Sequence, residues 1–220
     1  MLLEASIGKI LAKGIESIAK MDKVTNKFRD ITPKYLKEKL KDIKNLPGTK
    51  DNPFKLPRCI NEKLEGKTIN GVKYERKVFK IHGVYVEGVF PVFDGIKVTL
   101  PKSFDKLYKE LGNTDQKFYR KTMEEATKAL REELEKHPEL KKQFTEQQLE
   151  DIYAGKAKIT GKIWHHYEEL GEDGRPIMQL VDEKQHAGCK HTGGSYTWNE
   201  KNFQKSYKEE WDNAKNRNNE

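Results

Sequence analysis

Residues 163–194 read IWHHYEELGEDGRPIMQLVDEKQHAGCKHTGG, and this stretch holds four of the six histidines in the 220-residue chain. The four lie within 27 residues and are His165, His166, His186 and His191. A single histidine is most often a surface residue or a satisfied core residue, which is our expectation for His82 and His137. Four histidines so close together instead indicate a site where imidazole nitrogens bind a metal ion or transfer a proton.

The residues between the histidines predict the local structure. Ile163–His166 is typical of a short strand, Gly171–Gly174 of a turn and Ile177–Val181 of a second strand. Asp182 is a suitable N-cap for a short helix that carries His186. We therefore predict a β-hairpin followed by a helix, which brings one strand histidine against two histidines at the end of the helix.

Three histidines that converge in this way predict a metal centre. Three protein ligands leave one coordination position for water or substrate, as catalytic metal sites require. Adjacent side chains of a strand point to opposite faces, so His165 and His166 are not expected to bind the same ion, and one of them is free for proton transfer. The alternative for residues 186–194 is a structural zinc knuckle, in which Cys189 could be the fourth ligand.

Several short motifs, taken in order, carry a resemblance to a known family. Trp164-His165-His166, then Met178-Gln179-Leu180-Val181, then His186 and finally His191-Thr192-Gly193-Gly194 resemble the WHH family of toxin nucleases, in the HNH/endonuclease VII superfamily. The resemblance spans about residues 55–198. It includes GVFPVF at residues 88–93, a phrase associated with C-terminal domains of bacterial polymorphic toxins. It implies a ββα-metal fold that hydrolyses phosphodiesters with one divalent ion, and Zn, Mg, Mn and Ni are not distinguished.

The same resemblance implies roles for individual residues. His166 corresponds to the general base, and Gln179 stands in place of the asparagine that braces the loop behind the base in HNH enzymes. This glutamine and a long loop over Glu168–Ile177 are departures from the family pattern. The residues that correspond to the metal ligands are His165, His186 and His191. The nearby cations that could contact substrate phosphates are Arg175, Lys162 and Lys190.

The rest of the chain predicts an α+β fold, in which a small antiparallel sheet and helices surround the ββα core. Asn70-Gly71 and His82-Gly83 are turn dipeptides between apolar strands, and Ile96–Leu100 alternates like a further strand of the same antiparallel meander. Helices are expected over Phe104–Leu111, from Thr114 to Lys136, and after a capping box that begins at Thr145.

The domain organisation follows from these patterns. Residues 51–220 are predicted to form the HNH-like nuclease toxin domain, with the ββα core at about residues 160–198. Residues 1–50 are predicted to be a helical extension or a linker from a parent toxin, with helices over residues 7–21 and 33–46. The segment Thr49–Pro57 reads as a linker between the two regions.

Composition limits the function classes. The formal charge is +8, and residues 1–100 carry 21 of the 43 basic side chains but only 12 of the 35 acidic ones. Such a balance favours phosphate-rich partners. The longest apolar stretches, such as Val89–Phe93, fall far short of the roughly 20 residues that a membrane-spanning helix needs. Two cysteines, Cys59 and Cys189, are too few for a disulfide scaffold.

The residues and the resemblance together favour a metal-dependent endonuclease with DNA as the expected substrate. It would be the toxic domain of a secreted or delivered interbacterial effector, active in the target-cell cytoplasm and neutralised by an immunity protein, which charge complementarity predicts to be acidic. Two alternatives stay open, an RNA-cleaving toxin of the same fold and a zinc-stabilised nucleic-acid-binding module without catalysis. His166 separates a nuclease from a binding module, because a hydrolase needs a base, whereas a binding module has no need for a second histidine beside a ligand.

Overall fold

The computed structural model describes residues 47–56, 59, 61–111, 115–191 and 194–217. The helices predicted over residues 7–21 and 33–46 lie outside these ranges. The described residues form two compact units. Unit 1 comprises residues 47–56, 78–87 and 201–217, and unit 2 comprises the described residues of 59–77 and 88–200. No helix in the described ranges is long and apolar enough to cross a membrane.

Unit 1 is organised around a short strand and an aromatic helix. Strand β1 (Phe54–Lys55) pairs in parallel with β4 (Val84–Val92), so the segment predicted to be a linker instead contains a strand. The Phe54 ring packs edge-on against Tyr207 of α8 (Glu200–Arg217), and the Tyr207 hydroxyl donates a 2.9 Å hydrogen bond to the Pro47 carbonyl. These buried aromatic contacts explain why the segment before Pro57 is ordered.

A four-stranded sheet has the order β1-β4-β3-β2, with β2 at Thr68–Ile69 and β3 at Val72–Ile81. Both predicted turn dipeptides are confirmed. Asn70 and Gly71 have φ angles of 50° and 76°, and His82 and Gly83 have φ angles of 47° and 86°. Two successive positive φ angles give the backbone twist that joins antiparallel strands through two residues. A short 3-10 helix, η1 (Glu62–Leu64), precedes β2.

Strand β5 (Ile96–Thr99) lies in a second sheet, so the predicted single meander is wrong at this point. The second sheet has the order β5-β7-β6, with β6 at Lys162–Leu170 and β7 at Pro176–Asp182, and both neighbouring pairs are antiparallel. A Cβ atom at Gly95 would lie 2.0 Å from the Leu180 carbonyl oxygen. Glycine therefore lets the chain approach β7 closely and change sheets.

The predicted hairpin and helix of the histidine segment are confirmed. Strands β6 and β7 are joined through Gly171–Gly174, and α6 (Glu183–Ala187) follows directly. The Asp182 carboxylate caps α6 by accepting hydrogen bonds from the amides of Lys184 and Gln185, both at 3.0 Å. Such a cap satisfies amides that have no partner within the helix. Helix α6 ends at its C-cap, Gly188, and His191 follows three residues later.

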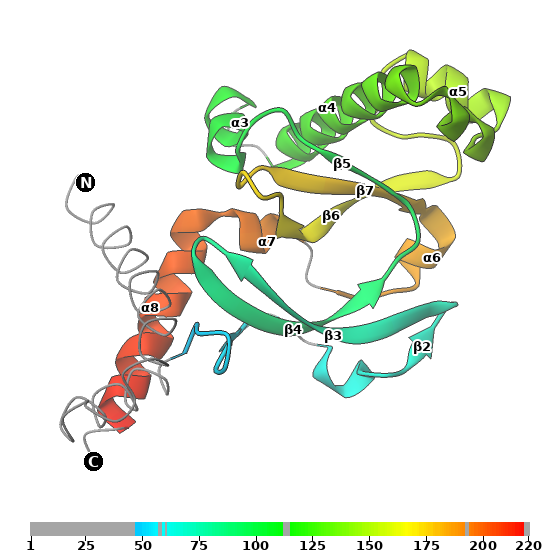
Figure 1. The fold of residues 1–220 in the computed structure, drawn as a ribbon. Coiled ribbons are helices and arrows are strands. Elements are labelled where there is room, and N and C mark those ends of the chain that lie inside the picture. Colours follow the sequence, from blue (N-terminus) through cyan, green and yellow to red (C-terminus); the bar gives the residue numbers. More distant parts are fainter. Residues whose placement is uncertain (1–46, 57–58, 60, 112–114, 192–193, 218–220) are drawn as a thin grey trace, which may run out of the picture. The chain divides into compact units, whose positions relative to one another are not determined.

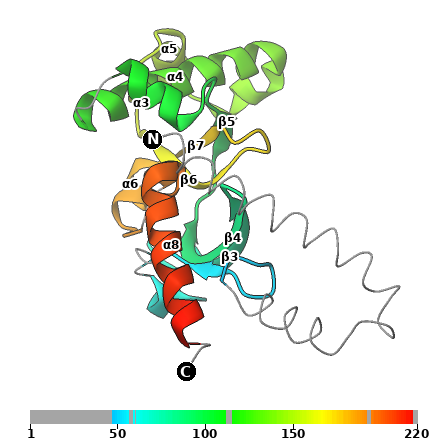
Figure 2. The same ribbon diagram turned by 90° about the vertical axis from the view of Figure 1, so that its left-hand side faces the viewer.

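Helices cover one face of the β5-β7-β6 sheet. Figures 1 and 2 show α3 (Phe104–Leu111), α4 (Asp115–Lys136) and α5 (Glu146–Tyr153) together on one side of these strands. Between α4 and α5 lies the 3-10 helix η2 (Pro138–Gln143). The predicted capping box is confirmed, because the Thr145 hydroxyl and the Gln148 side chain each bond the other residue's amide.

The core beneath these helices contains Leu130, Leu134, Ile152 and Met178, all without exposed surface. Trp164 of β6 is 1% exposed, and its indole N–H donates a 3.0 Å hydrogen bond to the Thr127 hydroxyl on α4. Burial of each large apolar side chain contributes about 1.5–3 kcal/mol. Trp164 therefore anchors the hairpin to the helices, as a core residue.

Candidate functional site

The strand register puts His165 and His166 on opposite faces of the sheet. His165 is paired with Gln179 and through it with Lys97 on β5, whereas His166 is paired with Met178, the neighbour of Val98. Met178 and Val98 belong to the core under the helices. His166 therefore shares the helix-covered face, and His165 faces the other way. We call that other side of the sheet the cluster face.

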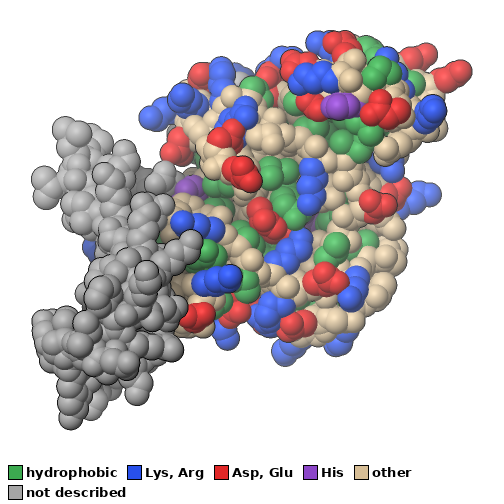
Figure 3. All heavy atoms as spheres, in the orientation of Figure 1, with side chains coloured by type: hydrophobic (Ala, Val, Ile, Leu, Met, Phe, Trp, Pro, Cys, Tyr) green, Lys and Arg blue, Asp and Glu red, His purple; other side chains and the backbone are tan. Residues whose placement is uncertain are grey.

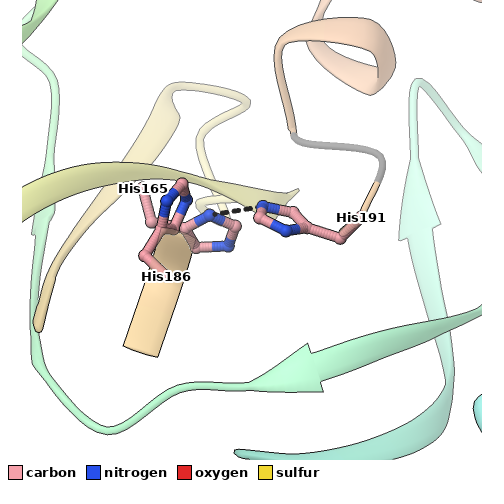
Figure 4. A group of neighbouring side chains, drawn as sticks. All are labelled: His165, His186 and His191. Atoms are coloured by element: carbon pink, nitrogen blue, oxygen red, sulfur yellow. Dashed lines mark hydrogen bonds between the residues drawn. The ribbon is translucent and has the colours of Figure 1, made fainter. Parts of the chain in front are cut away.

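Three histidines converge on the cluster face. His165 comes from β6, His186 from α6 and His191 from the segment after α6, and Figure 4 shows their rings directed toward one another. The ring centroids are 4.7 to 5.5 Å apart in pairs. Each histidine offers one nitrogen, and the three nitrogens lie within 4.8 Å of one another. The predicted three-histidine group is thus brought together in space.

Side chains of the β2–β3 hairpin hold the segments that carry His186 and His191. The side-chain amide of Asn70, in the hairpin turn, donates a 2.7 Å hydrogen bond to the Lys184 carbonyl of α6. The Tyr74 hydroxyl donates a 3.1 Å hydrogen bond to the Lys190 carbonyl. A hairpin more than 100 residues earlier in the chain therefore positions two of the three histidines.

A hydrogen bond fixes which nitrogen of His191 carries hydrogen. Nδ1 of His191 lies 2.8 Å from the Cys189 carbonyl oxygen, which can only accept, so Nδ1 is the donor and Nε2 has a free lone pair. Nε2 of His165 is buried and has no hydrogen-bond partner among the described residues, and a Glu168 carboxylate oxygen lies 3.7 Å from it. Nδ1 of His165 and Nε2 of His191 are 3.1 Å apart, within hydrogen-bond distance (Figure 4).

Two lone pairs that face each other at this distance repel unless a proton or a cation lies between them. In a tetrahedral site with Zn–N distances of about 2.0–2.1 Å, two ligand nitrogens lie about 3.4 Å apart. The observed spacing is close to that value, so this donor set fits a divalent metal ion. The group could bind a metal, and the residues alone do not select which one.

Electrostatics keep the cluster in the form that binds metal. Burial, together with charge repulsion from the neighbouring His191 and His165, lowers the pKa of His186 to about 4. Burial and His165 also hold the pKa of His191 below its ordinary value. Metal ligation requires neutral imidazole, so both residues are in the competent state at pH 7.

Phe93 packs against all three rings of the cluster. Its centroid lies 5.0 Å from that of His165, 5.4 Å from that of His186 and 5.6 Å from that of His191. Phe93 is the last residue of the GVFPVF phrase and is 6% exposed. The phrase is visible in the sequence, but its contact with the histidines arises because the chain passes from one sheet to the other between β4 and β5.

Gln179 braces this same loop. Its side-chain amide donates a 2.8 Å hydrogen bond to the Phe93 carbonyl, and the Gly95 carbonyl lies at 3.4 Å. The resemblance implied bracing of a loop behind the general base. The observed bracing acts on the cluster face instead, because Gln179 is paired with His165 and therefore points to the same side of the sheet.

His166 lies among aromatic rings on the helix-covered face and is not part of the cluster. Its ring centroid is 5.3 Å from that of Tyr119 and 5.1 Å from that of Trp198, which belongs to α7 (Gly194–Trp198). Its Nε2 atom is buried and has no hydrogen-bond partner among the described residues. Burial, together with the other three histidines, lowers the pKa of His166 to about 3, so its imidazole is neutral at pH 7.

A polar group next to the cluster was missed by the sequence analysis. Glu168 of β6 is 1% exposed and forms an ion pair with Lys77 of β3. Burial alone would raise the pKa of Glu168, but the His165 ring and the Lys77 ammonium hold it below its ordinary value.

Lys97 lies over the Tyr167 ring, with its Nζ 3.7 Å from the ring centroid. Burial and the nearby Lys77 charge lower the pKa of Lys97.

Two of the three predicted phosphate contacts, Arg175 and Lys162, lie apart from the cluster. Arg175 is in the hairpin turn, about 13 Å along the strand from Gln179, and it forms an ion pair with Asp173 at 2.6 Å. Lys162 has the strand parity of His166 and so belongs to the opposite face. Lys190 is exposed and lies directly between Cys189 and His191 in the sequence. In the described part of Figure 3, basic and acidic side chains are interspersed.

Cys189 is buried, but it is not part of the histidine group. Its Sγ lies 3.5 Å from the Ile69 carbonyl oxygen, and burial raises the pKa of its thiol. Among the described residues, the metal-capable group that includes His186 and His191 is completed by His165. This composition differs from a structural knuckle closed by a cysteine thiolate.

Comparison with known proteins gives an independent finding. Residues 82–193, just over half of the chain, match the family model of the DNase/tRNase domain of colicin-like bacteriocins. The matched segment contains all three cluster histidines, His166 and Gln179. No curated protein and no solved structure matches the chain. The chain therefore belongs to the family of colicin-like bacteriocin DNase/tRNase domains and is a nuclease toxin of the bacteriocin type.

Proposed function

We propose that this protein is a metal-dependent endonuclease of the HNH type, which hydrolyses phosphodiester bonds in DNA with His165, His186 and His191 as metal ligands. The observation that carries the proposal is the convergence of three histidines that each offer one ring nitrogen, all within 4.8 Å of one another, with Nδ1 of His165 and Nε2 of His191 3.1 Å apart. Membership of a nuclease family supports the reaction class. A purely structural cluster would not need to leave a coordination position open.

The chain's own residues divide the work as follows. A divalent ion bound at such a site polarises the scissile phosphate and stabilises the charge on the leaving oxygen. His191 holds the lone pair of its Nε2 inward, since its Nδ1 donates to the Cys189 carbonyl. Phe93 covers the rings and limits their movement, and Gln179 holds the Phe93 backbone. These contacts pre-organise the site before substrate arrives.

We assign the general base to His166. Its neutral imidazole is the form that accepts a proton, and it follows a ligand directly in sequence. Its buried Nε2 must become accessible to the attacking water, so this role includes a rearrangement of the Tyr119 and Trp198 rings around it. The same observation makes the role testable, because a histidine that only packs in the core would leave cleavage intact when replaced.

Lys97 is the cation that we propose as a phosphate contact. Lys97 is paired with Gln179, which is paired with His165 on the next strand. Lys97 therefore shares the cluster face with His165 and lies two strand spacings, or about 10 Å, from it. Its side chain is held over Tyr167 beside Lys77. An ammonium group in that position can contact the substrate backbone near the cluster.

RNA cleavage is the second candidate, because the matched family includes tRNases as well as DNases. Purified protein should be incubated with supercoiled plasmid and with total RNA, with EDTA and with several divalent ions in turn. We expect plasmid nicking that EDTA abolishes and a divalent ion restores. Cleavage of RNA alone would transfer the proposal to RNA. Binding without cleavage of either polymer would favour the zinc-stabilised binding module.

We also propose that the protein is a delivered effector, active in the target-cell cytoplasm and neutralised by an acidic immunity protein. The net charge of +8 supports an acidic partner, since charge complementarity accelerates association. Expression alone should be toxic to bacteria, and co-expression with the neighbouring open reading frame should restore growth. Equal growth with active chain and with the His166→Ala variant, without any such neighbour, would argue against the toxin role.

A further inference from the structure

An irregularity in β6 places a carboxylate beside a cluster histidine. In a regular strand, residues two apart share a face, whereas residues three apart point to opposite faces. His165 and Glu168 are three apart, yet a Glu168 carboxylate oxygen lies 3.7 Å from His165 Nε2, a buried nitrogen that has no hydrogen-bond partner among the described residues. The pairing of β6 with β7 shifts register between His166 and Leu170, and this bulge turns Glu168 to the cluster face. Bulges of this kind re-aim side chains beside active sites.

The bulge is fixed by bonds from α7. The Thr197 hydroxyl donates a 2.9 Å hydrogen bond to the Glu168 carbonyl, and the Trp198 indole donates a 2.9 Å hydrogen bond to the Tyr167 carbonyl. Both donors belong to the same short helix. The backbone on either side of the Tyr167–Glu168 peptide is therefore held in place, and so is the direction of the Glu168 side chain.

The Glu168 side chain is 2% exposed and that of His165 is 3% exposed, whereas the Lys77 side chain is 18% exposed. A buried carboxylate is costly unless it is paired, and Lys77 supplies the pair. Replacement of a buried ion pair by apolar residues is often neutral or stabilising, so fold stability alone gives little reason for this pair. The position of the carboxylate relative to His165 gives a better reason.

We propose that Glu168, held anionic and in place by Lys77, is a positioning residue that accepts the His165 Nε2 hydrogen and so presents Nδ1 to the metal ion. The proposal rests on the proposed metal-dependent function. Metal-bound histidines almost always donate their second ring hydrogen to such an acceptor, and loss of the acceptor typically lowers metal affinity by about 10–100-fold. Lys77 lies outside the matched segment 82–193, so the pair joins a family-matched strand to a preceding strand.

The test compares metal affinity in variants of the full chain. Calorimetric titration with Zn²⁺ should give about 10–100-fold weaker binding for Glu168→Leu/Lys77→Met, which removes both charges together. Glu168→Gln should recover part of the affinity, because its amide oxygen can still accept a hydrogen bond from Nε2, and it serves if the double variant fails to fold. Glu169→Gln is the matched control, because Glu169 accepts a hydrogen bond from the Tyr167 hydroxyl and has no proposed role at the metal site. The Glu169→Gln protein should bind Zn²⁺ with wild-type affinity.

A second readout separates positioning from mere structure. Nitrogen-detected NMR of the metal-free chain should show His165 protonated at Nε2 in the wild type and a mixture of tautomers in the double variant. Wild-type affinity in a folded double variant, or hydrogen on Nδ1 in the wild type, would overturn the proposal. Failure of the wild type to bind Zn²⁺ or any other divalent ion would instead overturn the proposed function, and the tautomer measurement would still decide the role of Glu168.

Discussion

The two faces of the β5-β7-β6 sheet hold adjacent histidines in opposite environments. On the cluster face, His165 meets two other imidazoles, one of them within hydrogen-bond distance of its Nδ1, and a Glu168 carboxylate oxygen lies 3.7 Å from its Nε2. On the helix-covered face, His166 lies among aromatic rings, and its buried Nε2 has no partner in the described part of the chain. Residue type and sequence position are nearly the same, so the face of the strand determines the chemistry.

The difference underlies the two roles that we propose, His165 as a metal ligand and His166 as the general base. A ligand needs a fixed direction, which the contact between Nδ1 of His165 and Nε2 of His191 supports. The proposed base is neutral at pH 7, and its buried Nε2 must be uncovered before it can accept a proton. Substitutions on the two faces should therefore have separable effects on metal affinity and on cleavage.

The largest effect is expected on the cluster face. His191→Ala should lower metal affinity and cleavage together by more than about 100-fold, because it removes a ligand and the lone pair that faces His165. It should also abolish the rise in melting temperature that the metal gives to the wild type. Calorimetry with Zn²⁺ and plasmid nicking measure both effects, with His137→Ala as the control for an exposed histidine. Full metal content with full activity would contradict the three-histidine site.

On the opposite face, His166→Ala should lower the cleavage rate by about 10²–10⁴-fold and leave the metal affinity within a fewfold of the wild type. The reason is that His166 is a proposed base and contacts no ligand of the cluster. Single-turnover nicking and Zn²⁺ titration on the same sample separate the two quantities. Nicking at the wild-type rate by a folded variant would reduce His166 to a packing residue.

The pH dependence of stability should reveal the buried histidines. Because the folded pKa values of His166 and His186 are about 3 and about 4, below the ordinary 6.5, their contribution to stability is complete above pH 6.5 and is lost as the pH falls toward those values. Each histidine should lower the free energy of unfolding of metal-free protein by up to about 1.4 kcal/mol per pH unit in this window. Urea titrations measure the slope, and His166→Phe should make it shallower. An unchanged slope would place His166 in contact with water.

The bracing of Phe93 should have a smaller effect. Gln179→Leu keeps the side-chain volume but removes the hydrogen bond to the Phe93 carbonyl, so the loop over the histidines should loosen and metal affinity should fall by about tenfold. Amide hydrogen exchange over residues 93–96 reports the loosening directly. Faster exchange with unchanged affinity would show that the loop does not hold the cluster.

The smallest effect is expected for the proposed phosphate contact. Lys97→Ala should weaken DNA binding several-fold and leave metal affinity unchanged. The slope of the logarithm of the binding constant against the logarithm of salt concentration should become shallower by about one. Fluorescence anisotropy at several salt concentrations gives both values. Lys128→Ala is a suitable control, since Lys128 is exposed on α4 and paired with Glu125. Identical slopes for the two variants would remove Lys97 from the interface.

Local signals made much of the fold predictable. The Asn70-Gly71 and His82-Gly83 turns, the Thr145 capping box and the Asp182 cap depend on residues within four positions of one another, and all are observed. The choice of partner for β5 is a long-range property, and no local pattern distinguishes one antiparallel neighbour from another. Helix α8 was missed, although the spacing of Phe203 and Tyr207 is that of one helix face.

The site was predictable to the same extent. Spacing and strand parity predicted that one strand histidine would meet His186 and His191 while its neighbour faced away, and the resemblance assigned these places to His165 and His166. The contacts of Phe93 and Glu168 depend on a sheet change at Gly95 and on a bulge in β6, which arise from packing between distant segments. Strict alternation along β6 would have put Glu168 on the helix-covered face, away from the cluster.

The most direct test is anomalous diffraction from crystals of the chain soaked with Zn²⁺ or Ni²⁺. We expect one strong peak about 2.0–2.1 Å from Nδ1 of His165 and from Nε2 of His191, with a His186 nitrogen as the third ligand. The peak should be absent from His191→Ala crystals. A peak at Cys189, or no peak under conditions in which the same protein cleaves DNA, would contradict a metal-dependent site on the cluster face.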